Sequence, residues 1–266
     1  MDHKYISGKN NAFIADIRKL KQKKHRDRTG LFYVEGTKLF KEVLDSDYKK
    51  NIKYIIYAET EDNKKAPLIK ELSAELTEDF IAVTPEVYKK ITDEEAFEGV
   101  MCVIEKPRAE VCLSYEKPVI ILSSVRDPGN VGAIIRTAYA LCGFEMIISQ
   151  DCADIYSGKT QRAAMGAAFR QKIKISGNLA EDIANLKKNG YNIFAAHLDK
   201  NSRPVNEAGF DAKTAVVFGN EGSGLDGATV SACDGKIIIP INPNSESLNV
   251  SVAAGIVLWE MRKKIN

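Results

Sequence analysis

Three polar stretches of the chain carry side chains that could do chemistry, and each follows a run of apolar residues. The first is residues 125–132 (VRDPGNVG), the second is residues 219–224 (GNEGSG), and the third is residues 239–249 (IPINPNSESLN). Polar loops held between rigid buried elements are common places for binding sites. We therefore expect the functional site to be built from these stretches.

The first stretch has the composition of an anion-binding turn. Gly129 and Gly132 let a ligand approach the backbone closely. The helix that follows offers free N–H groups and the positive end of its dipole, and Arg136 lies one to two turns inside it. A plain strand-to-helix turn with Arg136 in a surface salt bridge explains the same residues, so this stretch alone leaves phosphate binding open.

The second stretch is similar to a phosphate-binding P-loop only superficially. Its Gly-Lys-Ser/Thr ending is missing, which disfavours a nucleotide triphosphatase, and no strand leads into a GxGxxG dinucleotide fingerprint. What remains is flexible backbone with one carboxylate, Glu221, which suits a neutral or zwitterionic ligand with a purine-like edge. The alternative is that Glu221 is an ordinary acid at a helix N-terminus.

The third stretch leads into a helix of unusual composition. From Val252 to Trp259 this helix has no polar residue. A helix that is apolar on all sides is expected to be buried on more than one side. The loop in front of it is too rich in Asn, Ser and Pro for the core, so we expect the loop to line a site.

The elements that must position these stretches alternate between strands and helices. Expected strands are 119–122, 146–149, 172–175, 192–196, 215–218 and 236–239, and expected helices are 131–141, 158–169, 179–189 and 249–263. This alternation predicts an α/β fold, a mostly parallel sheet with helices on both faces. Because ligands sit at the carboxyl ends of parallel strands, we expect the three stretches to meet at one edge of the sheet.

A smaller α/β domain is predicted before this sheet. Expected helices are 39–44, 67–76 and 85–91, and expected strands are 53–57, 80–83 and 99–104. Residues 107–118 contain Pro107 and Pro118 and no clear periodicity, which indicates a linker. The expected organisation is residues 1–106, a linker at 107–118 and a larger domain at 119–266.

The composition excludes several classes of protein. The chain has 266 residues, 44% hydrophobic and 28% charged, which is typical of a globular protein. The chain has no run of about 18 apolar residues, so no membrane span is expected. The N-terminus lacks the pattern of a secretory signal. Five cysteines without a CxxC pair and three scattered histidines disfavour a disulfide framework and a metal site. We therefore expect a cytoplasmic protein without a metal.

A basic segment near the N-terminus is expected to contact phosphates. Between Arg18 and Arg28 the chain has seven basic residues: Arg18, Lys19, Lys21, Lys23, Lys24, Arg26 and Arg28. Such density is typical of segments that bind nucleic acid, although most charge runs are simply solvated. The segment suggests RNA or DNA without identifying which.

Three motifs in one order resemble a known family. Residues 130–138 (NVGAIIRTA), 218–225 (FGNEGSGL), and 239–241 together with 247–255 (IPI and SLNVSVAAG) are similar to the three motifs of the SpoU (TrmH-like) RNA 2′-O-ribose methyltransferases. Residues 1–106 resemble the substrate-binding domain of many members, which has the fold of small ribosomal proteins that bind kink-turn RNA. One departure is Pro243, which stands where the third motif usually has glycine.

The resemblance implies a fold, a cofactor and roles for residues. It implies a trefoil knot, a homodimer, and transfer of a methyl group from S-adenosylmethionine to a ribose 2′-hydroxyl. The cofactor would lie against Gly219, Asn220, Gly222, Ile239 and Leu248. The implied catalytic residues are Arg136, Asn130, Glu221 and Asn249.

Arg136 has a specific expected role. Because a guanidinium essentially does not deprotonate in proteins, our hypothesis is that Arg136 grips the neighbouring phosphate and stabilises the developing alkoxide. Asn130, Glu221 and Asn249 would orient the Arg136 head and the ribose. By analogy the substrate is large-subunit ribosomal RNA rather than transfer RNA. Alternatives are a transfer-RNA ribose methyltransferase, a non-catalytic RNA-binding or ribosome-assembly protein, and an enzyme acting on a small phosphate-bearing substrate.

Overall fold

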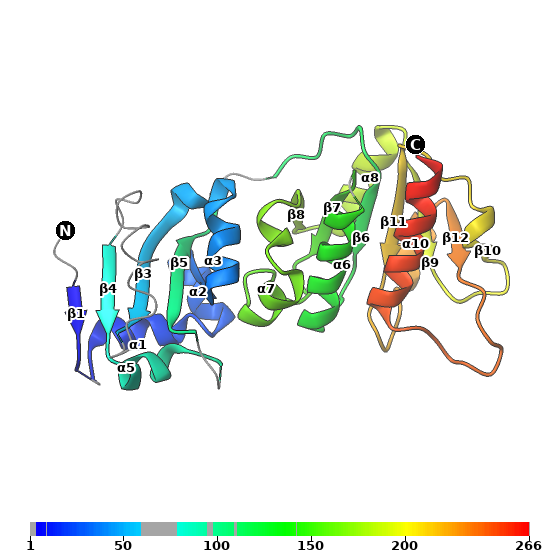
Figure 1. The fold of residues 1–266 in the computed structure, drawn as a ribbon. Helices are drawn as coiled ribbons and strands as arrows, with labels where there is room; N and C mark the ends of the chain where they lie inside the picture. The colour runs from blue at the N-terminus through cyan, green and yellow to red at the C-terminus, as the bar shows by residue number, and fades with distance from the viewer. Residues whose placement is uncertain are drawn as a thin grey trace. The chain divides into compact units, whose positions relative to one another are not determined.

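The computed structural model describes residues 4–8, 10–59, 79–94, 98–108, 111–141 and 143–265. The chain divides into two compact units (Figure 1). The N-terminal unit is Met1–Arg108 with Tyr156–Gly158, and the C-terminal unit is Ala109–Ile155 with Lys159–Asn266. The helix predicted at residues 67–76 lies outside the described residues.

The C-terminal unit is built on a parallel sheet. Its described strands are β6 (Val119–Leu122), β7 (Glu145–Ser149), β8 (Ile173–Ser176), β9 (Asn192–Ala196), β10 (Arg203–Pro204), β11 (Thr214–Phe218) and β12 (Gly235–Ile238). They run in the order β10-β12-β9-β11-β6-β7-β8, and every neighbouring pair is parallel. The central strands β6 and β11 are buried along their whole length, as continuous apolar runs in a sheet covered on both faces must be.

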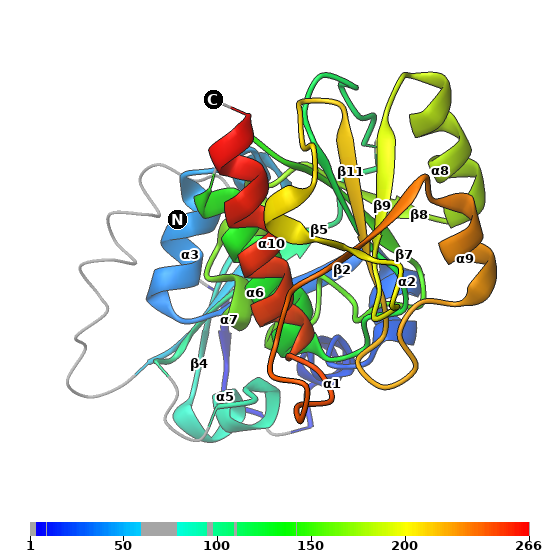
Figure 2. The same ribbon diagram turned by 90° about the vertical axis from the view of Figure 1, so that its right-hand side faces the viewer.

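Helices cover both faces of this sheet. On one face α6 (Pro128–Ala140) packs against α10 (Val250–Lys264), and on the other α8 (Leu179–Lys188) packs against α9 (Gly227–Ala232) (Figure 2). One further helix, α7 (Gly158–Ala164), precedes β8. The predicted α/β fold is therefore confirmed, while the trefoil knot stays a prediction.

One helix of this unit was predicted wrongly, and two short elements were missed. The helix expected at residues 158–169 is interrupted, because Met165 and Gly166 both have positive φ (50° and 84°) and a 3-10 turn follows at Ala167–Phe169. A left-handed residue ends an α-helix. The elements β10 and α9 were missed because two and six residues are too few to show a period.

The sequence around Asp127 sets where α6 begins. Its side chain accepts a hydrogen bond of 2.9 Å from the backbone N–H of Asn130. Pro128 takes the first helical position, where a missing N–H costs nothing. The helix therefore starts three residues before the predicted position.

Gly132 brings α6 and α7 into close contact. A Cβ at this position would lie 2.5 Å from the Cβ of Ala163 and 2.6 Å from the backbone oxygen of Thr160. The sequence suggested that Gly132 makes room for a ligand. Within the folded chain it makes room for another helix, so that interpretation is wrong.

Replacing Gly132 by alanine is therefore expected to destabilise the fold. Because backbone would have to move, we expect the free energy of unfolding to fall by about 1–3 kcal/mol, measured by equilibrium urea unfolding. Gly227→Ala is the control, since a Cβ there meets nothing within 4 Å. If the two variants are equally stable, the close contact between α6 and α7 is not real.

Helix α10 is only partly covered within one chain. Ala254, Val257, Leu258 and Met261 are buried, but Val252 and Trp259 are 52% and 54% exposed. The expectation that this helix is buried on more than one side is therefore not met by the single chain. Val252 and Trp259 are seven residues apart, so they lie on one face of the helix.

The N-terminal unit is a second, mixed sheet. Its described strands are β1 (Lys4–Ile6), β2 (Leu31–Glu35), β3 (Ile52–Ala58), β4 (Asp79–Val83) and β5 (Val100–Glu105), in the order β1-β4-β3-β5-β2. Strands β1, β4 and β3 are parallel, and β5 is antiparallel to both β3 and β2. Strand β2 was not predicted, although its apolar sequence LFYV is typical of a buried strand.

Short helices accompany this sheet. They are α1 (Ala12–Lys19), α2 (Lys23–Thr29), α3 (Thr37–Leu44), α5 (Pro85–Ile91) and a 3-10 turn at Asp47–Asn51. The core joins the apolar sides of α1 and α5 to the sheet through residues such as Ile14, Ile17, Val87 and Ile91. Among the described residues no helix has the length and apolarity needed to cross a bilayer.

Candidate active site

The three polar loops meet in a chain of side-chain hydrogen bonds. The amide Nδ2 of Asn249 donates to Oδ1 of Asn130 at 3.0 Å, and Nδ2 of Asn130 donates to Oε1 of Glu221 at 3.0 Å. These residues follow β12, β6 and β11. Because an ionised carboxylate only accepts, Glu221 fixes which end of the Asn130 amide faces it. The predicted meeting of the three loops at one sheet edge is therefore what the fold produces.

Glu221 also holds the backbone in front of α6. Its carboxylate accepts hydrogen bonds from the N–H groups of Arg126 (3.3 Å) and Asp127 (3.2 Å). Partial burial raises the pKa of Glu221, but the hydrogen bonds from Asn130, Asp127 and Arg126 outweigh it, so the pKa lies below its usual value. Glu221 is thus an ionised, orienting carboxylate at neutral pH and a poor proton acceptor.

The negative charge at the start of α6 is supplied by carboxylates of the protein. Asp127 caps the helix, and Glu221 takes the two N–H groups before it. The sequence suggested that a ligand phosphate binds here. The N–H groups of Arg126, Asp127 and Asn130 are thus paired with carboxylates of the protein, which corrects the phosphate interpretation of this turn to an internal cap.

Asn220 holds the second loop together. Its Oδ1 accepts from the N–H groups of Gly222 (2.9 Å) and Ser223 (3.1 Å), and its Nδ2 donates to the carbonyl of Ser124 at 2.8 Å. Its backbone exchanges two 3.0 Å hydrogen bonds with Gly224. The polar groups of Asn220 are therefore used within the protein, and it shapes the loop rather than presenting its side chain to a ligand.

Gly219 is required for the same turn. A Cβ there would lie 2.4 Å from the backbone carbon of Gly224 and 2.6 Å from the nitrogen of Leu225. Such a contact with backbone cannot be relieved by moving a side chain. At Gly222 an added Cβ would meet only Oδ1 of Asn220, at 3.6 Å. Gly219 thus lets the loop fold back on itself, and Gly222 leaves its outer side open.

Pro243 lies in a tight turn. The N–H of Ser245 donates to the carbonyl of Asn242 at 2.8 Å, and the N–H of Asn244 donates to Oδ1 of Asn242 at 2.9 Å. Proline is favoured at the second position of such a turn because its φ is already set. The departure at Pro243 therefore has a local structural reason.

The third loop offers groups that fit an adenosyl ligand. Leu248 is 36% exposed, and the backbone of residues 246–248 makes no hydrogen bond with the rest of the described chain. Ile239 is half-buried at the start of the loop. Free backbone donors and acceptors beside apolar side chains suit a neutral heterocycle. The residues present thus fit S-adenosylmethionine.

Arg136 is exposed on α6, and its side chain makes no hydrogen bond or ion pair within the described residues. It lies six residues after Asn130, which on a helix is a different face. The expected orientation of its head by Asn130, Glu221 and Asn249 is therefore not present in the isolated chain. Its guanidinium is left available for a phosphate or an alkoxide.

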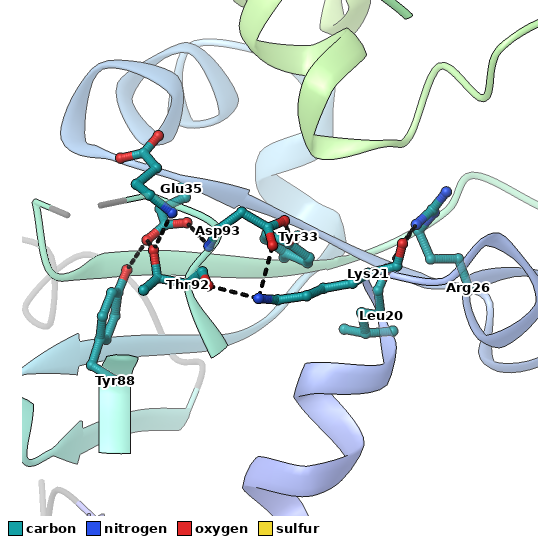
Figure 3. Close-up of polar contacts among 9 residues, drawn as sticks. Leu20, Lys21, Arg26, Tyr33, Glu35, Tyr88, Thr92 and Asp93 are labelled. Atoms are coloured by element: carbon teal, nitrogen blue, oxygen red, sulfur yellow. Dashed lines mark hydrogen bonds and ion pairs between the residues drawn. The ribbon is translucent and has the colours of Figure 1, made fainter. Parts of the chain in front are cut away.

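Two of the seven basic residues near the N-terminus are tied into the N-terminal unit (Figure 3). Arg26 is only 4% exposed, and its guanidinium donates to the carbonyls of Leu20 (2.8 Å) and Lys21 (2.9 Å). Lys21 donates to the carbonyl of Thr92 at 2.6 Å and pairs with Asp93 at 2.8 Å. Arg26 is thus a buried structural residue, which corrects its predicted RNA contact.

The loop that Lys21 reaches is itself anchored to β2. Glu35 is buried and accepts hydrogen bonds from the hydroxyls of Tyr88, at 3.1 Å, and Thr92. Tyr33 donates to Asp93 at 2.5 Å. Burial raises the pKa of Glu35 despite these hydrogen bonds. Figure 3 shows these side chains converging from β2, α5 and the loop after it.

The other five basic residues are exposed. Lys19 pairs with Asp16 at 3.3 Å, Lys23 pairs with Asp27 at 2.7 Å, and Arg28 contacts His25 Nδ1 at 2.9 Å. Arg18 and Lys24 have no partner within the described residues. The surface that remains for phosphates is therefore smaller than the basic segment suggests.

Some residues that build the site were not predicted from the sequence. Asp127 was not predicted to cap a helix, although an acidic residue followed by proline is a helix-start signal. Ser124 and Asp151 gave no signal in the sequence, because they contact each other from the ends of two different strands. Among the described residues no cluster of His, Cys, Asp and Glu could hold a metal ion.

Comparison with known proteins agrees with this geometry. The SpoU rRNA Methylase family matches residues 117–259, and the MRM3-like substrate binding domain matches residues 11–102. A relative, the 23S rRNA (guanosine(2553)-2′-O)-methyltransferase RlmP of Bacillus subtilis (strain 168), is 30% identical over 97% of this chain and 99% of its own length.

Solved structures agree as well. An rRNA methyltransferase from Sinorhizobium meliloti has a TM-score of 0.87 at 29% identity and covers 100% of both chains. An AdoMet-bound rRNA methyltransferase from the same organism has a TM-score of 0.84 at 28% identity, covering 99% of this chain and 98% of the other.

The sheet and its loop site therefore define the class of S-adenosylmethionine-dependent RNA ribose methyltransferases. Within that class the chain belongs to the SpoU rRNA methylase family. The resemblance seen in its three motifs is thus confirmed. Its reaction is the 2′-O-methylation of RNA, and its methyl donor is S-adenosylmethionine.

Proposed function

We propose that this enzyme methylates a ribose 2′-hydroxyl of large-subunit ribosomal RNA. The observation that carries the proposal is the hydrogen-bonded chain Asn249–Asn130–Glu221, which ties the three loops into one site. The name of the relative RlmP supports a ribosomal rather than a transfer-RNA substrate, and we propose that the enzyme acts in the cytoplasm.

The reaction breaks the bond between the donor sulfur and its methyl group, forms a bond from that methyl group to the 2′ oxygen, and releases the hydroxyl proton. It therefore needs a positioned acceptor and a way to stabilise the negative charge that develops on the oxygen. When bound, S-adenosylmethionine supplies an electrophilic methyl group. Positioning of two reactants can contribute roughly 7–11 kcal/mol of barrier reduction. Arg136, exposed and unpaired within the described residues, grips a phosphate next to the target ribose and stabilises the developing alkoxide. Asn130, Glu221 and Asn249 hold the loops in register.

Mapping 2′-O-methyl groups in cells with and without the gene tests this assignment. We expect the loss of a single methyl group from large-subunit ribosomal RNA, which returns when the intact gene is supplied. Loss from transfer RNA alone would replace the ribosomal assignment. An unchanged methylation pattern would favour a non-catalytic role in RNA binding or ribosome assembly.

We infer that the exposed cations Arg18, Lys19, Lys23, Lys24 and Arg28 contact the RNA backbone. Arg18 and Lys24 have no partner to give up among the described residues, so they should contribute most. Lys21 is assigned to the fold instead, because its ammonium group is paired with Asp93.

Replacing Arg18 and Lys24 together by alanine is expected to weaken RNA binding. The slope of log K against log salt should become shallower by about one unit for each phosphate that the variant no longer neutralises. Binding of S-adenosylmethionine, measured by calorimetry, should not change. Lys188→Ala, on an exposed part of α8, is the control. Weaker cofactor binding by the double variant would refute the division of labour between the two units.

We also infer a homodimer formed through the exposed face of α10. Val252, Trp259 and Tyr139 of α6 are all exposed large apolar side chains, and α6 packs against α10. Trp259→Asp is expected to yield a monomer in sedimentation equilibrium, because a buried unpaired charge is costly. Leu198→Asp, an equally exposed apolar residue elsewhere, should leave the mass unchanged. A wild-type chain that sediments as a monomer contradicts the inference.

A further inference from the structure

The loop after β7 contains a carboxylate that none of the three motifs includes. Asp151 accepts a hydrogen bond from the hydroxyl of Ser149 at 2.5 Å and another from the hydroxyl of Ser124. The Ser149 oxygen in turn accepts the backbone N–H of Ser124 at 3.0 Å. Asp151 and Ser149 thus grip Ser124 by both its side chain and its backbone.

Ser124 needs such a grip because of its conformation. Its φ is +57°, in the left-handed region that residues other than glycine rarely adopt. A residue in this region persists only when its surroundings hold it there. Next to it, the N–H of Val125 donates to Sγ of Cys152 at 3.2 Å, and the N–H of Ala153 donates to the carbonyl of Val125 at 2.9 Å. The loops after β6 and β7 are therefore fastened together at this point.

The carbonyl of Ser124 is hydrogen-bonded to the second motif. It accepts Nδ2 of Asn220 at 2.8 Å, and Oδ1 of the same amide holds the N–H groups of Gly222 and Ser223. If Ser124 left its left-handed conformation, its carbonyl would turn away from Asn220. The loop at 219–224 would then lose one of the hydrogen bonds that fix the direction of the Asn220 amide.

We propose that Asp151 is a positioning residue for the methyl-donor site: it holds Ser124 left-handed, and Ser124 holds the Asn220 loop. The ionised state of Asp151 agrees with this role. Hydrogen bonds from Ser124 and Ser149 keep its pKa below the usual value, so the carboxylate is ionised at neutral pH. In this role Asp151 acts through the loop, and the inference rests on the cofactor lying against that loop.

Substitutions at Asp151 and Ser124 test this directly. Asp151→Ala is expected to weaken S-adenosylmethionine binding about tenfold in calorimetry without RNA. Without the carboxylate, Ser124 is no longer held in its left-handed conformation, and the Asn220 loop loses its fixed position. Asp151→Asn keeps one acceptor oxygen and should be intermediate. Adding Ser124→Gly to Asp151→Ala should restore most of the affinity, since glycine adopts positive φ without help.

A matched control lies before a strand, at the end of the sheet opposite the site. Asp211 precedes β11 and also accepts a hydroxyl, from Thr214 at 3.0 Å, and a backbone N–H, from Lys213 at 2.8 Å. Asp211→Ala should leave cofactor affinity unchanged. An Asp151→Ala variant that binds the cofactor like the wild type, or one that Ser124→Gly does not rescue, overturns the inference.

A second measurement separates this inference from the assignment of function. Amide hydrogen exchange at Gly222 and Ser223 should be faster in Asp151→Ala and slow again in the double variant with Ser124→Gly. This readout needs no ligand, so it judges the inference even if the wild-type chain fails to bind S-adenosylmethionine, a result that would contradict the function instead. Unchanged exchange at both amides contradicts the inference.

Discussion

Replacing Arg136 by lysine is expected to lower the rate of methyl transfer about 100-fold or more, the range seen when one donor to a developing oxyanion is removed. A lysine keeps the charge but cannot present two parallel N–H groups to a phosphate and an alkoxide. Because the Arg136 side chain is exposed and forms no hydrogen bond or ion pair with the described residues, the effect should appear in kcat and not in stability.

The matched control for this prediction is Arg203→Lys, an exposed arginine on β10. It should leave turnover within a factor of about two of the wild type. Single-turnover kinetics with saturating cofactor would separate chemistry from binding. Near-normal turnover in Arg136→Lys would show that charge alone is sufficient. It would contradict the proposal that the guanidinium binds the phosphate and the alkoxide through two N–H groups.

Replacing Asn130 by aspartate is the second large effect that we expect. The new carboxylate would face the Glu221 carboxylate across the 3.0 Å now bridged by an amide N–H, and like charges at that distance repel and raise the pKa of one partner. The loops before α6 and after β11 would separate. A displacement of about 1 Å in a catalytic site can cost about 100-fold in rate.

Companion variants distinguish repulsion from simple removal of a bond. Asn130→Ala removes both hydrogen bonds without adding charge, so it should be less harmful than Asn130→Asp. Combined with Asn249→Ala it should show non-additive effects, because the two asparagines share one bond. Asn189→Ala, at the end of α8, is the control. Additive effects would mean that the hydrogen-bonded chain does not act as a unit.

Much of the C-terminal unit was predictable because its signals are local. The strands are continuous apolar runs, such as Val119–Leu122, and the helices between them follow from the alternation of apolar runs and polar loops. Since parallel strands end on the same side of a sheet, the sequence predicted that Asn130, Glu221 and Asn249 lie on one side. Their contact also depends on the strand order and on the packing of α10 against α6. The elements that escaped prediction, β10 and α9, are too short to show a period.

The use of each polar group was not predictable in the same way. Gly132 and Gly129 look alike in the sequence, yet only Gly132 lies against another helix, where an added Cβ would come within 2.6 Å of the Thr160 backbone. Arg26 and Lys24 are both basic residues of α2, yet one is buried and one is exposed. A spacing of two residues in a helix places side chains on different faces, but which face turns inward depends on packing.

The sequence by itself determined the class of fold, the three motifs and the site they form, because each rests on neighbouring residues or on the order of strands. Only the tertiary structure decided what the site's groups are used for. Glu221 fills the helix start that seemed open to a phosphate, Asn220 is used to fold its own loop, and Asp151 enters from another strand end. Hydrogen bonds between residues distant in the chain have no local pattern, so they exist only once the sheet has formed.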